Sequence, residues 1–240
     1  MFQSPQFTSD TGLGRIAVAA FGLGFVMALH VALLIYYAVA IGVDATDRWH
    51  CVALWSVYMI ALCFFHLSEF MLIASFRPST VSYESFLLNH SKEYHLALVV
   101  SWVEFWLQVW LVPSWKANPT VFTTGVVLVV FGQWCRILAM WTAASNFSHR
   151  IEYIKRKEHV LVTHGIYRFI RHPSYTGWFF WTMGSQVVLA NPLCTLGYSF
   201  VSWSFFRDRV PYEEHLLVQF FPDEYPQYRQ RTISGVPFVR

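Results

Sequence analysis

Long stretches without charged residues are the feature of this 240-residue sequence that most limits what it can fold into. Four of them form single blocks: Ile16–Val43 and Trp49–Ser68 contain no Asp, Glu, Lys or Arg, Tyr94–Trp115 contains only Glu104, and Ala117–Ala144 contains only Arg136. The apolar character of the second block resumes after Glu69 and continues to Phe76. Because a helix needs roughly 20 apolar residues to span a bilayer, each block predicts one membrane-spanning helix.

A fifth stretch, Pro173–Phe206, also has no charged residue, but Asn191-Pro192 interrupts it near the middle. Proline disfavours helix at the residue before it, so we expect a hairpin of two short or tilted spans that turns there. Only 13% of the residues are charged and 55% are hydrophobic, whereas roughly a quarter of a soluble domain is charged. The composition therefore argues against an ordinary soluble enzyme and favours six spans in lipid.

The distribution of Lys and Arg supports this count. Six spans with a cytosolic N-terminus place only Arg48 and Lys116 on the far side of the membrane. Arg136 lies inside a span, and all other basic residues fall on the near side: Arg15, Arg77, Lys92, Arg150, Lys155, Arg156, Lys157, Arg168, Arg171, Arg207, Arg209, Arg229, Arg231 and Arg240. An asymmetry of this size is the positive-inside signature. Five spans would put the basic tail, Arg207–Arg240, on the opposite side of the membrane from the basic loop, Ala143–His172.

The predicted fold is thus an all-α, polytopic membrane protein of about six transmembrane helices. Residues 1–142 are expected to form the N-terminal helices, and residues 143–240 a cytosolic loop, the final hairpin and a C-terminal helical segment, together in one integrated membrane domain. In that segment Glu213–Phe221 mixes charged and apolar residues as a packed or interfacial helix does. Pro211 is predicted to mark the start of this helix.

The sequence contains no recognisable metal-binding or dinucleotide-binding motif. Cys51, Cys63, Cys135 and Cys194 lie far apart in apolar stretches without a C-x-x-C pair, and are expected to be buried thiols. His159, His164 and His172 do not have metal-ligand spacing, so we predict no metal site. No G-x-G-x-x-G follows a plausible strand, so no Rossmann domain is expected.

Two polar clusters are the best candidates for chemistry. The first, His159–Tyr175, contains His159, His164, Arg168, Arg171 and His172 and directly precedes the hairpin. The second, Arg207–Glu214, begins where the hairpin ends. Both ends of a hairpin return to one membrane face, so the two clusters should lie on the same side. On charge pattern alone, a juxtamembrane ion pair is the preferred interpretation of the second cluster.

Several motifs resemble one family. They are Arg171–Gly177 (RHPSYTG), His159–Val162 (HVLV), Glu213-Glu214, Ser85–Glu93 (SFLLNHSKE) and Asn146–His149 (NFSH). Together they resemble the integral-membrane isoprenylcysteine carboxyl methyltransferases from about Trp49 to Phe238. An RHPxY segment with paired acids alone would also fit wider membrane methyltransferases, including those that methylate phospholipid amines. The SFLLNHS and NFSH segments favour the narrower family.

The resemblance implies an enzyme that transfers a methyl group from S-adenosylmethionine to the C-terminal farnesyl- or geranylgeranyl-cysteine carboxylate of a processed CaaX protein. It also implies residence in the endoplasmic reticulum membrane, with the site facing the cytosol. The implied partners are prenylated protein C-termini and membrane lipid, with no nucleic acid.

The resemblance also assigns residues to the site. Arg209 would hold the substrate carboxylate, as a guanidinium can do bidentately. The cofactor would contact Glu152, His159, Val160, Leu161, Val162, Tyr167, His172, Pro173, Ser174, Tyr175 and Glu213. Glu152 is the weakest assignment because relatives can have Gln there. Arg171 is expected to shape the pocket. Glu69 and Glu104 are acids inside predicted spans and are therefore functional candidates by default, but they are left out of the site because an acid near a helix end can simply pair or reach water.

The prenyl chain should enter from lipid between spans, with candidate wall residues Trp102, Phe105, Trp106, Trp178, Phe179 and Trp181. For each of these, ordinary packing is the simpler interpretation. Two other functions stay open at this point. One is a phospholipid or small-amine methyltransferase that uses the same cofactor pocket, and the other is a non-enzymatic transporter or scaffold.

Overall fold

The computed structural model describes residues 4–41, 47–89 and 91–239. Long helices dominate it: α2 (Leu13–Tyr36), α3 (Asp47–Phe76), α4 (Lys92–Leu111), α5 (Pro119–Ala143), α6 (Pro173–Val188) and α7 (Pro192–Phe220). Short helices α1 (Pro5–Thr8) and α8 (Tyr225–Gln230) lie near the two ends. Short 3₁₀ or π turns cover Tyr37–Ile41, Pro78–Thr80, Tyr83–Phe86, Pro113–Lys116, Ala144–Asn146 and Gly165–Arg168. The described residues form no β-strand, so the all-α prediction is confirmed.

Four helical segments are long and apolar enough to cross a membrane: Leu13–Ala40, Arg48–Phe76, Lys92–Leu111 and Pro119–Asn146. They coincide with the four predicted single spans. The predicted hairpin is also present, because α6 ends at Val188 and α7 begins at Pro192. However, α6 has only 16 residues, fewer than the roughly 20 that a perpendicular crossing needs.

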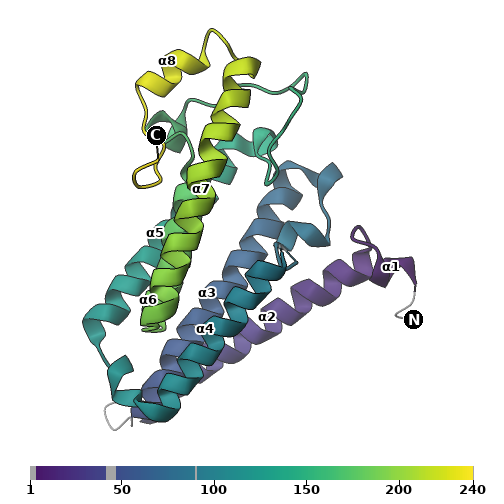
Figure 1. Cartoon of the computed structure of the whole chain (residues 1–240). Coiled ribbons are helices and arrows are strands. Elements are labelled where there is room, and N and C mark those ends of the chain that lie inside the picture. The colour runs from purple at the N-terminus through teal and green to yellow at the C-terminus, as the bar shows by residue number, and fades with distance from the viewer. Residues whose placement is uncertain (1–3, 42–46, 90, 240) are drawn as a thin grey trace.

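The long helices form two groups that lean apart (Figure 1). α5, α6 and α7 form one group, and α2, α3 and α4 form the other, with α2 packed along α3. Within the first group, α5 and α6 are in very close contact. A Cβ atom added at Gly132 would lie 2.5 Å from the backbone nitrogen of Trp181, and one at Gly177 would lie 2.6 Å from the carbonyl oxygen of Gly132. Small residues at these crossings let two backbones approach, as is common between membrane helices.

A buried polar network holds the hairpin turn against α4. The Glu104 carboxylate accepts hydrogen bonds from the backbone amides of Leu193 (3.0 Å) and Cys194 (2.7 Å), which are the first amides of α7. Lys116 Nζ donates to the carbonyl of Leu189 (2.7 Å) and to Asn191 Oδ1 (3.2 Å) just after α6. An acid at a helix start and a cation at a helix end both complement the helix dipoles. Glu104, which had no predicted role, therefore caps α7.

The prediction that Pro211 starts a new helix is wrong. α7 is one helix of 29 residues that runs through Pro211 to Phe220. Proline removes one backbone N–H, so the carbonyl of Arg207 loses its partner four residues on, but the fixed φ of the ring is compatible with a helix. The predicted helical character of Glu213–Phe221 is confirmed up to Phe220.

The tail after α7 turns back onto the start of α6. Ile233 and Ile170 form an isolated parallel bridge, and Trp203 Nε1 of α7 donates to the carbonyl of Pro237 at 2.9 Å. Val236 and Val239 are buried against α6 and α7. All four cysteines are buried, as predicted.

Candidate active site

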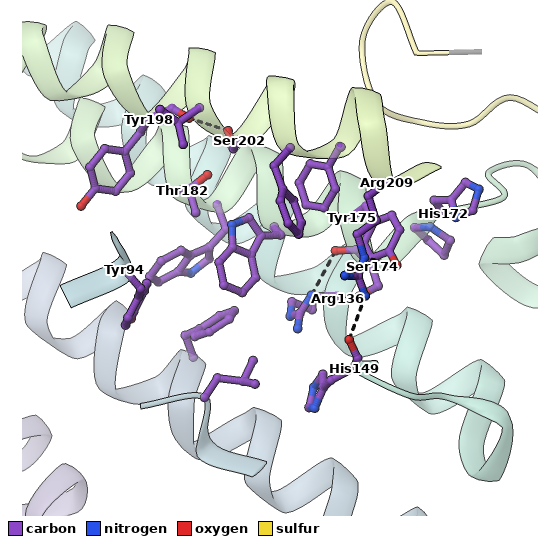
Figure 2. Close-up of a pocket in the computed structure, with 18 of the residues that line it drawn as sticks. Tyr94, Arg136, His149, His172, Ser174, Tyr175, Thr182, Tyr198, Ser202 and Arg209 are labelled. Carbon is purple, nitrogen blue, oxygen red and sulfur yellow. Dashed lines mark hydrogen bonds between the residues drawn. The ribbon is translucent and has the colours of Figure 1, made fainter. Parts of the chain in front are cut away.

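A cavity of about 1240 Å³ lies between α3 and α4 on one side and α6 and α7 on the other. One end is polar and is formed by the loop after α5, the start of α6 and the last turns of α7. The other end reaches Glu104 and Cys194, and the wall between them is mainly aromatic and aliphatic. Figure 2 shows Arg209, Tyr175 and His172 toward one end and Tyr94 and Tyr198 toward the other. The volume exceeds the roughly 300–1,000 Å³ of ordinary small-molecule sites.

Eleven of the twelve residues predicted for the site line this cavity: His159, Val160, Leu161, Val162, Tyr167, His172, Pro173, Ser174, Tyr175, Arg209 and Glu213. They come from three separate parts of the chain, which the hairpin and the basic loop bring to the polar end. Glu152 is not among the lining residues. Its carboxylate lies 3.8 Å from Arg77 and 3.6 Å from Arg156, which places it in a partly buried ion cluster with these two arginines.

The hydroxyl of Tyr175 lies between the two most important predicted side chains. It donates a short hydrogen bond to Glu213 Oε2 and accepts one from Arg209 Nε at 2.8 Å. The Tyr175 ring is held by stacking between His172 and Phe206, with centroid distances of 5.4 and 4.9 Å. Because α7 continues through Pro211, Arg209 and Glu213 lie one helical turn apart and reach the same phenol.

Glu214 has a different role from its neighbour Glu213. Its side chain is 1% exposed and contacts three cationic or titratable groups: Arg171 Nε at 2.7 Å, Arg229 Nε at 3.0 Å and His172 Nε2 at 3.2 Å. Burial alone would raise the pKa of Glu214, but the hydrogen bonds and charges of His172 and Arg171 lower it to about 2. Arg171 also donates to the carbonyl oxygens of Arg229 and Thr232. Glu214 therefore ties the tail to the start of α6, and it holds Arg171, which also lines the cavity.

Comparison with known proteins identifies the family. The sequence profile of the isoprenylcysteine carboxyl methyltransferase (ICMT) family matches residues 125–219. Protein-S-isoprenylcysteine O-methyltransferase of Dictyostelium discoideum is 44% identical over 183 residues, which are 76% of this chain and 77% of the relative. The chain belongs to the isoprenylcysteine carboxyl methyltransferase family.

Other relatives agree with this membership of the ICMT family. The human protein-S-isoprenylcysteine O-methyltransferase is 46% identical over 183 residues, which are 76% of this chain and 64% of the human protein. The match thus spans less than two thirds of that longer relative. One solved structure is described as the eukaryotic intramembrane Ras methyltransferase ICMT without a monobody. Its superposition covers 98% of this chain and 80% of the chain in that structure, with a TM-score of 0.86 and 38% sequence identity.

Two buried residues beside the site, Glu69 and Arg136, and the partly buried His149 were not predicted as site residues in this ICMT-family chain. Arg136 of α5 forms a bidentate ion pair with Glu69 of α3, and Nη2 lies 3.0 Å from Glu69 Oε2. His149 Nε2 donates to the same oxygen at 2.7 Å. Glu69 and Arg136 are both visible in the sequence as single charged residues in apolar runs, and a charge inside a span is a functional candidate by default. Their pairing depends on how α3 and α5 pack, which the sequence pattern does not contain.

Four buried polar atoms on the cavity wall have no hydrogen-bond partner among the described residues. They are His159 Nδ1 and the hydroxyl of Tyr225 at the polar end, together with Trp181 Nε1 and the hydroxyl of Tyr198. Burial lowers the pKa of His159 and the charge of Arg156 lowers it further, so its imidazole is neutral at pH 7. Buried polar atoms are normally paired, so these four are available to a ligand.

Two of the six residues predicted for a prenyl wall line the cavity. Trp178 and Trp181 line the cavity, whereas Trp102, Phe105, Trp106 and Phe179 do not. Trp102 donates to the Tyr58 hydroxyl at 3.1 Å, and Phe105 is fully buried in the core beside Trp55. For these residues the simpler interpretation, helix packing, holds.

Proposed function

We propose that this protein methylates the C-terminal carboxylate of farnesyl- or geranylgeranyl-cysteine on processed CaaX proteins, with S-adenosylmethionine as methyl donor. The main support is the position of Arg209, where the polar end of the cavity meets its apolar part. Its guanidinium carbon lies 5.5 Å from the ring centre of Phe205 and 5.4 Å from that of Tyr175. A permanent cation beside an apolar channel suits a ligand with a carboxylate at the end of a hydrocarbon chain.

The polar end suits the methyl donor. S-adenosylmethionine presents an adenine, an amino acid head and a sulfonium that gives up its methyl group to a nucleophile. His159 Nδ1 and the Tyr225 hydroxyl would satisfy polar atoms of the ligand, because neither has a partner of its own. Glu213 supplies a carboxylate on the same wall, which balances cationic charge and accepts hydrogen bonds.

The acceptor needs little activation. A C-terminal carboxyl has a pKa well below 7, at roughly 3.5, and is therefore already ionised. The task of the protein is to remove water from this carboxylate and to hold it in one orientation. Arg209 would bind it, and Trp178 and Phe205 would exclude water. Such positioning contributes up to roughly 7–11 kcal/mol to lowering a barrier.

The membrane setting follows from the same proposal. We place six crossings, with α6 and the first part of α7 as the last two, in the endoplasmic reticulum membrane with the polar end toward the cytosol. The prenyl chain would enter from lipid between the two groups of helices. Burial of each CH₂ of that chain contributes about 0.8 kcal/mol.

A methylation assay on the purified protein tests the proposal. We expect methyl transfer to a farnesylcysteine carboxylate and none to phosphatidylethanolamine. Arg209→Ala should lower kcat/KM for the carboxylate by about 100-fold, the usual effect of removing one charge-stabilising donor. Glu213→Ala should instead weaken S-adenosylmethionine binding, measured by calorimetry.

The matched control is Arg207→Ala, because Arg207 lies on the same helix, is half exposed and pairs with Asp208 at 3.3 Å. This variant should retain wild-type methylation. Activity on the phospholipid alone would favour the phospholipid methyltransferase, and absence of saturable S-adenosylmethionine binding would favour a transporter or scaffold. If Arg209→Ala and Glu213→Ala both keep full activity, the residue roles are wrong.

A further inference from the structure

Glu69 is a buried acid that the proposed chemistry does not use. It lies in α3, is 1% exposed and is not among the residues that line the cavity. Both of its oxygens are nevertheless occupied by side chains that do line it. Arg136 binds Oε1 and Oε2, and His149 binds Oε2. Glu69 can therefore influence a ligand only through these two neighbours.

Each neighbour makes a second contact with a predicted site residue. The carbonyl of His149 accepts a hydrogen bond from Arg209 Nη2 at 3.0 Å, and Arg136 Nη1 donates to Ser174 Oγ at 2.8 Å. Figure 2 shows both contacts as dashed lines. One carboxylate is thus linked along one path to the proposed substrate residue and along another to the proposed cofactor pocket.

The path through His149 matters more, because His149 has no helix to orient it. It lies after the 3₁₀ turn Ala144–Asn146, in a loop without regular structure. The direction of its carbonyl is set by nearby tethers, namely the bond from its own ring to Glu69 and the bond from Arg77 Nη1 to the carbonyl of Phe147 at 2.9 Å. Without the Glu69 bond, the carbonyl that anchors Arg209 loses the tether that its own side chain provides.

We infer that Glu69 and His149 are positioning residues that hold the Arg209 guanidinium for carboxylate capture, an inference that rests on the proposed function. Arg209 has five N–H groups. Bonds to other described residues use Nε, toward Tyr175, and Nη2, toward His149. Both N–H groups of Nη1 and the second of Nη2 remain for the substrate. Fixing a long side chain before binding removes an entropic cost that binding would otherwise bear.

The test compares His149→Ala and His149→Gln with wild type in the full-length purified protein. His149→Ala should raise KM for a farnesylcysteine carboxylate about tenfold, while Kd for S-adenosylmethionine stays within about twofold. Binding of the matching farnesylcysteine carboxamide, which has no charge for Arg209 to hold, should not change. Since a Gln side chain can still donate to Glu69, His149→Gln should recover most of the lost affinity. His164→Ala, in the same loop but exposed and outside the cavity, is the control.

Combining His149→Ala with Arg209→Ala completes the experiment. The double variant should be no worse than Arg209→Ala alone, because His149 acts through Arg209. Additive losses, or equal weakening of carboxylate and carboxamide, would overturn the inference and leave the proposed function intact. A wild-type protein that does not methylate farnesylcysteine would overturn both.

Discussion

At the scale of single residues, one phenol oxygen connects the two proposed binding sites. Tyr175 accepts from Arg209 and donates to Glu213, so each of those charged side chains is oriented by the same atom. Stacking against His172 and Phe206 fixes the ring of Tyr175, and this holds the hydroxyl in one position. Whatever ligand draws Glu213 or Arg209 away from this oxygen must compensate for the lost hydrogen bond.

Tyr175→Phe tests this connection. The variant keeps the stacked ring, so its unfolding temperature should change little. Because hydrogen bonds to charged groups contribute about 1.5–3 kcal/mol, KM for the prenylcysteine and Kd for S-adenosylmethionine should each rise about tenfold or more. Steady-state kinetics and calorimetry measure the two effects. Tyr212→Phe is the control, since Tyr212 is exposed and does not line the cavity. Wild-type constants for Tyr175→Phe would show that the hydroxyl connects nothing.

The residues that sequence reasoning found and missed differ in a physical way. Tyr175, His172 and Glu213 lie in motifs whose resemblance to a family names them directly. Glu69 and Arg136 lie in no such motif, and His149 ends the NFSH segment without a role assigned to it. The three meet across 67 and 80 residues of chain, at a point fixed by helix packing. A lone charge in an apolar run indicates that some partner exists. Which partner it is depends on the rotation of each helix, and hydropathy does not contain that information.

At the scale of helices, the contact between α5 and α6 positions the polar end. Gly132 and Gly177 face each other at the crossing, and Arg136 follows Gly132 by one helical turn. The same close approach brings Arg136 to Ser174 at the start of α6, at 3.2 Å from its carbonyl oxygen. The small residue Gly132 at the crossing therefore determines whether Arg136, while paired with Glu69, can reach Ser174 in the polar end of the cavity.

Gly132→Val should separate these helices. The added Cβ would lie 2.5 Å from the Trp181 backbone nitrogen and 2.6 Å from the Gly177 carbonyl oxygen, neither of which can move alone. Overpacking of this kind costs about 1–3 kcal/mol or more, so we expect a lower unfolding temperature and loss of methylation. Gly22→Val in α2 is the control, because nothing lies within 4 Å of its added Cβ. Equal stability of the two variants would contradict the role given to the crossing.

The ends of helices could be predicted where the sequence changes from apolar to polar or contains a turn signal. They could not be predicted where tertiary packing overrides the helix-breaking preference of a single residue. Charge-free runs located α2 to α5, and Asn191-Pro192 located the turn between α6 and α7. Pro211 misled the prediction, because the helix continues through it. Contacts from Arg209, Glu213 and Glu214 to the start of α6 and the basic loop hold both sides of the proline in one helix.

At the scale of the whole molecule, the polar end is assembled from segments far apart in the chain, and Glu214 joins three of them. It contacts Arg171 before α6 and Arg229 in α8, while its own backbone belongs to α7. With the Ile170–Ile233 bridge, this cluster closes the tail over the end of the cavity. The carboxylate of Glu214 thereby links the folding of the membrane helices to the docking of the tail over the end of the cavity.

This linkage predicts how stability depends on pH. The pKa of Glu214 is about 2 in the folded protein, against an ordinary value of 4.5. A depressed carboxyl pKa stabilises the fold fully above the ordinary value, and the contribution is lost as pH falls from 4.5 toward 2. The difference corresponds to about 3 kcal/mol. The unfolding temperature of wild type should therefore fall steeply across this window, measured by thermal unfolding in detergent.

Glu214→Gln isolates the contribution of this one carboxylate from all other acid effects. At pH 7 the variant should unfold at a lower temperature, because Arg171 is left buried beside a neutral amide, and removal of one partner of a buried pair costs about 3–5 kcal/mol. Its unfolding temperature should then change less than that of wild type between pH 4.5 and pH 2, since the titrating group is gone. Asp223→Asn, an exposed acid in the same tail, should follow wild type. A Glu214→Gln curve parallel to wild type through this window would mean that other carboxylates hold the tail in place.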